Sequence, residues 1–204
     1  MIDIYYLTFG LLAYLGFINR KNSLSFIIAL VPLLAIVVFR YGVGADYFSY
    51  EHIYTLNTGK TIQEARAVFP NIDYGYLAIG YVFQLIGVPF ELYFIIITAI
   101  ITLFITLWIK DNSSNPVLSI FLFYAMFFFV WNLSAIRQGL VLSMGLYFVF
   151  NKKLPLATPL KIGIILLLSL LHSSGLILLL LLMFAKLRLS KKAHLIILVL
   201  SLLV

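Results

Sequence analysis

The sequence predicts an all-α fold: a polytopic transmembrane helical bundle with a long outer loop and with short helices that are re-entrant or broken. Hydrophobic residues make up 64% of the 204-residue chain, charged residues only 10%, and the mean hydropathy of +1.12 lies far outside the range of soluble proteins. Several apolar runs approach the length of about 20 residues that a helix needs to cross a bilayer. The runs do not alternate between apolar and polar residues as the strands of a membrane β-barrel do. Helices are therefore expected to satisfy the hydrogen-bonding groups of the backbone in lipid.

The first half of the chain contains two apolar runs followed by one long polar interval. Residues 4–18 form the first expected span, which a polar stretch ends, and residues 24–39 form the second. A proline inside the second run is tolerable because lipid-embedded helices accommodate it. Residues 40–74 are polar and are expected to be an extracytoplasmic loop. A short amphipathic helix is expected at 74–86, and the Gly-Val-Pro sequence at 87–89 ends it.

The second half contains longer apolar runs that short polar sequences separate. Spans are expected at 90–109, 117–133 and 137–150. The next run is interrupted by His172-Ser173-Ser174-Gly175, so two short helices are expected, at 162–171 and 174–185. Residues 193–204 begin a last run that reaches only roughly 18 Å at 1.5 Å per residue. The chain, residues 1–204, is therefore expected to be one integral membrane domain that stops inside an incomplete span, as a fragment would.

Lysine and arginine placement predicts which loops face the cytoplasm. If the loops at 20–21, 110, 152–161 and 186–192 lie inside, ten of the 14 basic residues are cytoplasmic. The same bias requires segment 162–185 to enter and leave the bilayer on the cytoplasmic side, as a hairpin. A single tilted span is the alternative for this segment, and it would move one basic loop to the outside.

Two polar groups at membrane depth are candidates for function, because polar residues are costly there. Arg137 has a planar guanidinium, which suits a phosphate group better than an ammonium does, and the adjacent Gln138 and Gly139 favour that interpretation. The alternative is an interfacial arginine that extends to lipid headgroups. His172 belongs to a polar patch and can donate a hydrogen bond to a sugar or phosphate, or accept a proton; a packing role is the alternative.

The polar interval begins with the sequence RYGVGADYFSY at residues 40–50. Its two glycines permit a sharp exit from the second span, so that Arg40 and Asp46 are expected to face one cavity. As a nucleotide-binding loop the pattern is weak, because no strand precedes it and no GKS or GKT sequence follows. A metal site is not expected, because the chain has no cysteine and no second ligand lies at a suitable spacing from His172.

A second acidic and aromatic cluster, Asp73-Tyr74-Gly75-Tyr76, begins the short helix at 74–86. Tyrosines are common at membrane interfaces, where they anchor helices. Carbohydrate sites also stack aromatic faces beside carboxylates. Both interpretations therefore stay open for Tyr41, Tyr47, Tyr50, Tyr74 and Tyr76.

These motifs occur in an order that resembles a known family. The sequences Arg40-x-Gly42-x-Gly44-x-Asp46-Tyr47-x-x-Tyr50, Asp73-Tyr74-Gly75-Tyr76, Ile136-Arg137-Gln138-Gly139 and His172-Ser173-Ser174 resemble those of EpsG-like proteins. That family comprises multi-span, Wzy-type polymerases of exopolysaccharide, capsule and O-antigen. The resemblance covers nearly the whole chain. Two differences are that the family more often has glutamate at the position of Asp73, and that its members are usually longer.

The resemblance implies glycosyl transfer at the outer face of a bacterial plasma membrane by a multi-pass enzyme. The implied donor is a growing glycan on undecaprenyl pyrophosphate, and the acceptor is a lipid-linked repeat unit. No cofactor or metal is implied, because arginines can neutralise the pyrophosphate. Asp46 is the leading candidate for general base, with His172 as its competitor, and Arg40 and Arg137 are expected at the pyrophosphates. Substrate binding is expected from Arg40, Tyr47, Tyr50, Asp73, Tyr76, Arg137 and Gln138.

Two other functions remain open at this level. A transporter or flippase of lipid-linked sugars would use the same arginines, but it predicts a polar path through the whole bilayer, and the polarity here is confined to the outer half. A non-catalytic membrane component that works with other polysaccharide assembly proteins is the second alternative. Nucleic acid is not an expected partner, because basic cytoplasmic loops account for the net charge of +7.

Overall fold

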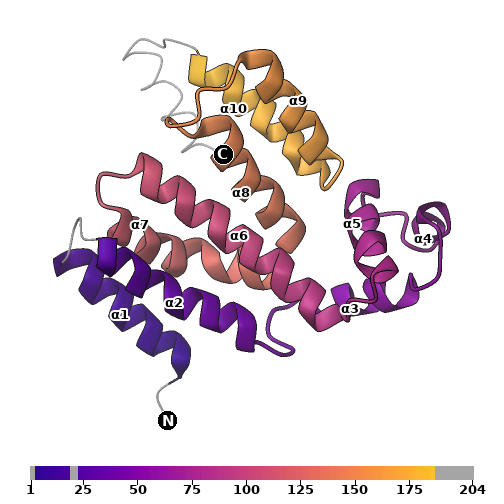
Figure 1. Cartoon of the computed structure of the whole chain (residues 1–204), viewed down its shortest axis with the longest axis horizontal. Coiled ribbons are helices and arrows are strands. Elements are labelled where there is room, and N and C mark those ends of the chain that lie inside the picture. The colour runs from indigo at the N-terminus through magenta and orange to yellow at the C-terminus, as the bar shows by residue number, and fades with distance from the viewer. Residues whose placement is uncertain (1–2, 19–22, 187–204) are drawn as a thin grey trace, which may run out of the picture.

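The computed structural model describes residues 3–18 and 23–186. Within these ranges every regular element is a helix and no strand occurs, which confirms the predicted all-α bundle (Figure 1). The basic residues near 20–21 and 188–192, and the short apolar run at 193–204, lie outside the described residues.

The helices differ in length, with the shortest in the polar interval between the second and third predicted spans. In chain order they are α1 (Ile4–Ile18), α2 (Ser23–Phe39), α3 (Tyr47–Leu56), α4 (Ile62–Val68), α5 (Tyr74–Leu85), α6 (Phe90–Asn112), α7 (Pro116–Phe123), the π-helix η1 (Tyr124–Ser134), α8 (Ile136–Phe150), α9 (Thr158–Ser169), the 3₁₀ helix η2 (Ser173–Leu176) and α10 (Ile177–Lys186).

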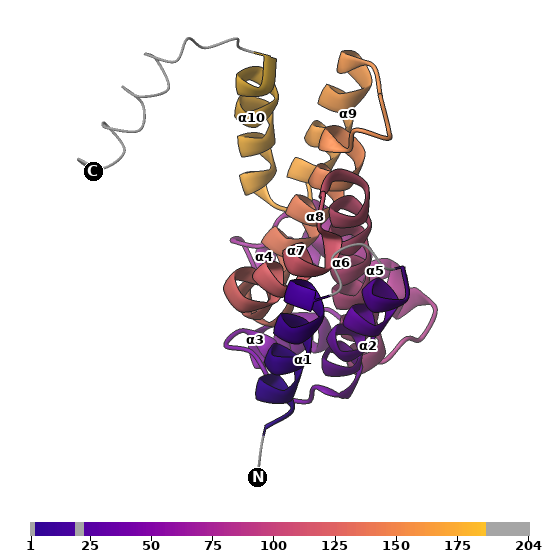
Figure 2. The same ribbon diagram turned by 90° about the vertical axis from the view of Figure 1, so that its left-hand side faces the viewer.

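Helix α6 is the central helix of the bundle. Its buried residues recur every three or four positions from Phe90 to Ile109, as in a helix that packs along one face. Helices α2 and α8 pack on α6, and α1 packs on α7. These five helices therefore lie side by side, as both views show (Figures 1 and 2).

Two helical stretches are long and apolar enough to cross a membrane. They are α6, with a mean hydropathy of 2.6 in its most apolar window, and the continuous α7–η1 helix, Pro116–Ser134, with 1.9. Helices α1, α2 and α8 are also apolar but shorter. Large apolar side chains such as Phe17, Ile27 and Val31 are exposed on α1 and α2. An apolar surface of this kind marks a membrane-associated protein.

The residues between α2 and α6 fold into three short helices at one end of the bundle, which we call the outer layer (α3, α4 and α5). Helix α4 begins at a capping box, in which Thr61 Oγ1 accepts a hydrogen bond from the Glu64 amide and the Glu64 carboxylate accepts one from the Thr61 amide. Helix α4 packs chiefly on α5. Figure 1 shows all three helices beside the amino-terminal end of α6.

Helices α9 and α10 form a hairpin that packs on α8 (Figure 2). They contain 12 and 10 residues, so each is roughly 15–18 Å long and too short to cross a bilayer. The chain reverses at residues 170–176, as it would not in a single tilted span. This hairpin tip meets the outer layer, because the Gly75 amide donates a hydrogen bond of 2.8 Å to the Leu170 carbonyl.

The other end of the bundle has its own set of bonds between helices. Asp111 accepts hydrogen bonds from Asn151 Nδ2 at 2.9 Å and from Lys153 Nζ at 2.8 Å. Asn115 Nδ2 donates to the Gly16 carbonyl at 3.3 Å. The described part of the basic loop after α8 therefore lies at the end of α6 opposite to the outer layer.

Candidate functional site

Asp73 joins three segments that are far apart in the sequence. Its Oδ2 accepts a hydrogen bond from Arg137 Nη1 at 3.3 Å and lies 3.1 Å from His172 Nδ1. Asp73 precedes α5, Arg137 lies in the first turn of α8, and His172 precedes η2. The three side chains are 18–25% exposed, so they are shielded but can be reached. We call these three residues the Asp73 cluster.

The tautomer of His172 matters for what the cluster can do. When Nδ1 carries the proton, the Nδ1–H group donates a hydrogen bond to the Asp73 carboxylate, and Nε2 has a lone pair that can accept a further proton. Nε2 has no hydrogen-bond partner in the described ranges 3–18 and 23–186. The cluster therefore contains a histidine that a carboxylate orients, beside an arginine that can bind an anion.

Two glycines bring the backbones of the cluster together. A Cβ added at Gly75 would lie 2.6 Å from the Leu170 carbonyl oxygen, so α5 approaches the hairpin tip at a distance that only glycine allows. A Cβ added at Gly139 would lie 2.2 Å from the Trp131 carbonyl oxygen. Because Gly139 follows Arg137 by two residues, this second contact fixes the first turn of α8 against the end of η1.

Two buried tyrosines of the outer layer border the cluster. The Tyr76 ring centre lies 6.0 Å from Arg137 Cζ, and the Tyr50 and Tyr76 rings lie 5.8 Å apart. Burial raises the pKa of the Tyr50 phenol, and the Arg137 guanidinium partly opposes this rise. Burial also raises the pKa of Tyr76 well above its ordinary value. Both phenols are therefore neutral at physiological pH and can donate hydrogen bonds.

Arg40 lies outside the Asp73 cluster, in a more buried place. Its Nη1 donates a hydrogen bond of 2.6 Å to the Asn132 carbonyl, and its Cζ lies 4.3 Å from the centre of the Phe94 ring. Only 7% of the residue is exposed, and burial lowers the pKa of Arg40 to about 10. The Phe94 ring lies 5.9 Å from that of Tyr50. The Tyr50 ring therefore lies between the ring beside Arg40 and the ring beside Arg137.

Asn132 links Arg40 to α6 and was not predicted as a site residue. Its Nδ2 donates to Thr102 Oγ1 at 2.6 Å and to the Thr98 carbonyl at 3.2 Å. Thr98, Thr102 and Thr106 follow one another at four-residue spacing, and each hydroxyl donates to the carbonyl four residues earlier. That spacing of threonines inside an apolar span is the sequence signal that could have revealed this polar face.

The first motif supplies the turn that packs on the end of η1. Gly44 has a φ of +113°, and a Cβ added there would lie 1.7 Å from the Leu133 carbonyl oxygen. The following amide, of Ala45, lies 3.3 Å from Ser134 Oγ and donates to it. Gly44 thus allows close contact between two backbones, whereas the Cβ position of Gly42 lies beside the Phe48 ring.

The other predicted residues lie around the cluster. Asp46 is the exposed N-cap residue of α3 and raises the pKa of the Tyr50 phenol through its charge, but it has no hydrogen bond to the cluster in the part of the chain that the structure describes. Tyr47 is 2% exposed, and four other aromatic rings pack around it. Gln138 is exposed and lines a separate cavity of about 180 Å³ on the apolar side of α8.

A metal ion does not fit the Asp73 cluster well. Across residues 3–18 and 23–186, no group of three or more histidine, cysteine, aspartate or glutamate side chains lies close enough to hold one. The cluster offers one carboxylate and one imidazole, and the positive charge of Arg137 would repel a cation. Its chemistry suits an anion and a hydroxyl group.

A comparison with known families identifies the group to which this site belongs. The sequence model of the EpsG family matches residues 23–204, a range that includes all four motifs and the whole Asp73 cluster. The chain belongs to the EpsG family. No curated protein and no solved structure matches the chain.

Membership of the EpsG family confirms the resemblance that the motifs indicated. It identifies the chain as a membrane protein of polysaccharide biosynthesis, in which lipid-linked saccharides are the chemical context. In this EpsG protein, the four motifs lie at one end of the bundle. Three of them supply the Asp73 cluster, and the first supplies Arg40, which contacts η1.

Proposed function

We propose that this EpsG protein polymerises lipid-linked oligosaccharide repeat units into exopolysaccharide, capsule or O-antigen. The reaction is glycosyl transfer from an undecaprenyl-pyrophosphate-linked chain at the outer face of the plasma membrane. The observation that supports it best is the Asp73 cluster, in which a carboxylate, an imidazole and a guanidinium lie within hydrogen-bond distance. Family membership supplies the polysaccharide context.

The proposed reaction needs a base and a group that stabilises the leaving pyrophosphate. The acceptor hydroxyl attacks the anomeric carbon of the donor, the bond between that carbon and the pyrophosphate oxygen breaks, and the hydroxyl proton passes to the base. We assign the base to His172, because Asp73 fixes its ring orientation. Asp46 becomes the second candidate, because no comparable bond positions its carboxylate in the described residues.

We assign the leaving pyrophosphate to Arg137. The bond to Asp73 holds one guanidinium nitrogen, and the 19% exposure of the side chain leaves donors within reach of a ligand. Arg40 has a different proposed role. Its buried bond to the Asn132 carbonyl fixes the end of η1, and with it the start of α8. Because its carboxylate contacts both His172 and Arg137, we assign Asp73 the role of a positioning residue for these two side chains, and not only that of a sugar contact.

Conservative replacement of Arg137 tests this assignment. Arg137→Lys retains the positive charge but loses the planar pair of donors, so we expect the polymerisation rate to fall about tenfold, as for the loss of one charge-assisted hydrogen bond. The measurement is product chain length and rate with purified protein in nanodiscs and lipid-linked repeat units. Lys153→Ala, at the opposite end of the bundle, is the control and should retain wild-type rates. A wild-type product distribution from Arg137→Ala would contradict the assignment.

We also propose that the chain crosses the plasma membrane several times, with residues 40–74 outside. Because the chain contains no cysteine, single cysteines can be introduced one at a time. A cysteine at Gln63, which is exposed on α4, should react with an impermeant thiol reagent in intact cells. A cysteine at Lys152, which is exposed after α8, should react only after the cells are opened. Labelling of position 152 in intact cells would contradict this topology.

A further inference from the structure

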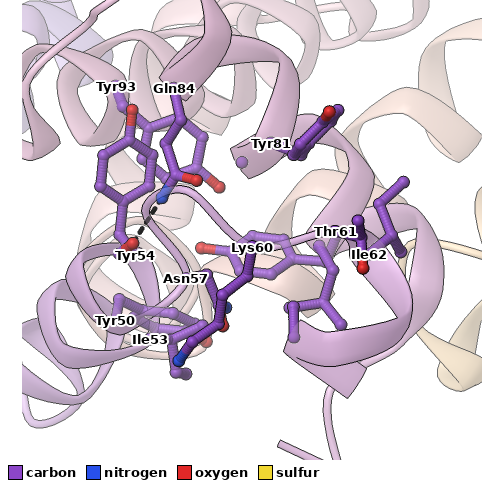
Figure 3. A pocket seen from close by; sticks show the side chains of 14 residues that line it. Tyr50, Ile53, Tyr54, Asn57, Lys60, Thr61, Ile62, Tyr81, Gln84 and Tyr93 are labelled. Atoms are coloured by element: carbon purple, nitrogen blue, oxygen red, sulfur yellow. Dashed lines mark hydrogen bonds between the residues drawn. The ribbon is translucent and has the colours of Figure 1, made fainter. Parts of the chain in front are cut away.

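The outer layer encloses a pocket that the proposed mechanism does not use. It lies between α3, α4, α5 and the first turn of α6, and Figure 3 shows its side chains. Tyr93 and Gln84 lie on one side, and Thr61 and Ile62 lie on the opposite side. Its walls combine the rings of several tyrosines with amide and hydroxyl groups, a combination that binds molecules with one apolar face and a polar edge.

Three polar atoms that line this pocket have no hydrogen-bond partner beyond one another in the described residues. They are Asn57 Oδ1, the Tyr76 hydroxyl and the Tyr93 hydroxyl, and the two hydroxyls lie close enough to interact with each other. All three residues are at least nine-tenths buried, with exposed fractions of 8%, 3% and 1%. Buried polar groups are hydrogen-bonded in the great majority of cases, so three unpaired atoms around one space indicate a site that a ligand completes.

The neighbouring polar groups already have hydrogen-bond partners, so the three unpaired atoms are not needed as partners for them. The Tyr54 hydroxyl donates to the Val88 carbonyl at 2.7 Å, and Gln84 Nε2 donates to the Tyr54 carbonyl. The Tyr54 and Tyr93 rings stack 4.7 Å apart at 22°. The walls formed by α3, α5 and α6 are therefore held by their own contacts, and the unpaired atoms are not needed to hold them.

The pocket is narrow in this structure. About 370 Å³ of empty space lies within it when its open side is counted, but only about 20 Å³ admits the centre of a water molecule, enough for one water. A sugar ring requires one wall to move. Helix α4 is the wall that can do so, because it packs chiefly on α5 and is only seven residues long.

Two residues that line the pocket also border the Asp73 cluster. Tyr50 and Tyr76 line the pocket, and the Tyr76 ring centre also lies 6.0 Å from Arg137 Cζ. Among the described residues, Lys60 is the one charged residue that lines it, and its ammonium group donates to the Leu56 carbonyl. A lipid tail would leave the three polar atoms unpaired, and a phosphate would find little positive charge. An uncharged ring that carries several hydroxyl groups can pair with the three polar atoms and needs no positive charge.

We infer that this pocket is a subsite for one pyranose unit of the acceptor, with Tyr93 and Asn57 as the residues that hydrogen-bond its hydroxyl groups. The inference rests on the proposed function, because it places the acceptor glycan beside the base and the leaving-group arginine. Helix α4 moves outward to admit the ring and closes over it.

Removal of single unpaired groups tests the subsite. Tyr93→Phe should raise the KM for the lipid-linked acceptor about three- to tenfold, the effect of losing one hydrogen bond to a ligand, with little change in kcat. Asn57→Ala should do the same. The melting temperature of Tyr93→Phe should change little, because the Tyr76 hydroxyl is the one group near its hydroxyl in the described residues and is itself otherwise unpaired. Tyr124→Phe is the matched control: its hydroxyl donates to the Tyr5 carbonyl at 2.9 Å, so the melting temperature should fall and KM should not change.

A binding measurement separates this inference from the proposed function. The probe is the repeat-unit oligosaccharide released by mild acid from the lipid of the producing cells, followed by saturation-transfer NMR with the full chain in nanodiscs. Binding that Tyr93→Phe and Asn57→Ala weaken, in a chain that does not polymerise, would support the subsite and reject the polymerase. Polymerisation with an acceptor KM that neither variant changes would reject the subsite and keep the polymerase.

Discussion

Replacement of His172 by glutamine is expected to lower the polymerisation rate by about 10²- to 10⁴-fold, the usual contribution of a positioned general base. Glutamine can still donate a hydrogen bond to Asp73, which now lies 3.1 Å from His172 Nδ1, but it cannot accept a proton at neutral pH. The expected change is therefore in kcat, with KM and the melting temperature close to wild type. The measurement is single-turnover transfer by purified protein.

His52 offers a matched control for this substitution. It is an exposed histidine on α3, and its ring packs edge-on against Phe69. His52→Gln should transfer sugars at the wild-type rate. Asp73→Asn provides the second comparison: it keeps the size of the side chain but removes the charge that orients His172 and Arg137, so the rate should fall while acceptor binding remains. A His172→Gln protein that polymerises normally would exclude the histidine as base and return that role to Asp46.

Replacement of Gly44 by alanine is expected to prevent the turn after α2 from packing on η1. Two costs add, because the φ of +113° is unfavourable for any residue with a side chain and because the new Cβ would lie 1.7 Å from the Leu133 carbonyl oxygen. We expect a loss of more than about 3 kcal/mol in stability, since a backbone atom cannot move aside as a flexible side chain can. The measurement is thermal unfolding in detergent, together with the yield of folded protein.

Gly59 separates the two costs. Its φ is +77°, but no atom lies within 4 Å of the Cβ position. Gly59→Ala should therefore lose only about 1–2 kcal/mol, the cost of the left-handed backbone conformation alone. Equal losses in the Gly44 and Gly59 variants would show that the contact with Leu133 contributes nothing.

The sequence predicted the fold class because apolar run length is a direct consequence of bilayer thickness. In the described residues the structure has two separate helices, α9 and α10, on either side of His172, and it also has helix α3 inside the polar interval 40–74. The π-helix could not be predicted. A π-turn differs from an α-turn by one residue in its hydrogen-bond spacing, as in the bond from the Ala135 amide to the Val130 carbonyl, and an all-apolar run carries no periodicity that distinguishes them.

The candidate site was predictable in its members but not in its pairings. Arg137, Asp73 and His172 stood out because polar groups are rare in such a chain, yet the sequence could not show that one carboxylate oxygen contacts both partners. Arg40 and Arg137 looked equivalent in sequence. Tertiary packing separates them, because Arg40 is enclosed by Phe94 and η1 whereas Arg137 stays partly open. Tyr93 was overlooked because an aromatic residue in an apolar span usually has only a packing role.

The two bonds to Asp73 Oδ2 span 64 and 99 residues of sequence. Contacts of such long range form late, because the intervening chain must first be ordered. The second of them also requires the α9–α10 hairpin, which follows α8 in the chain, to pack on α8. During synthesis, the arginine and the carboxylate can meet well before the histidine arrives. Under the proposed function, we therefore expect that a nascent chain cannot transfer sugars until the α9–α10 hairpin has packed on α8 and placed His172 beside Asp73.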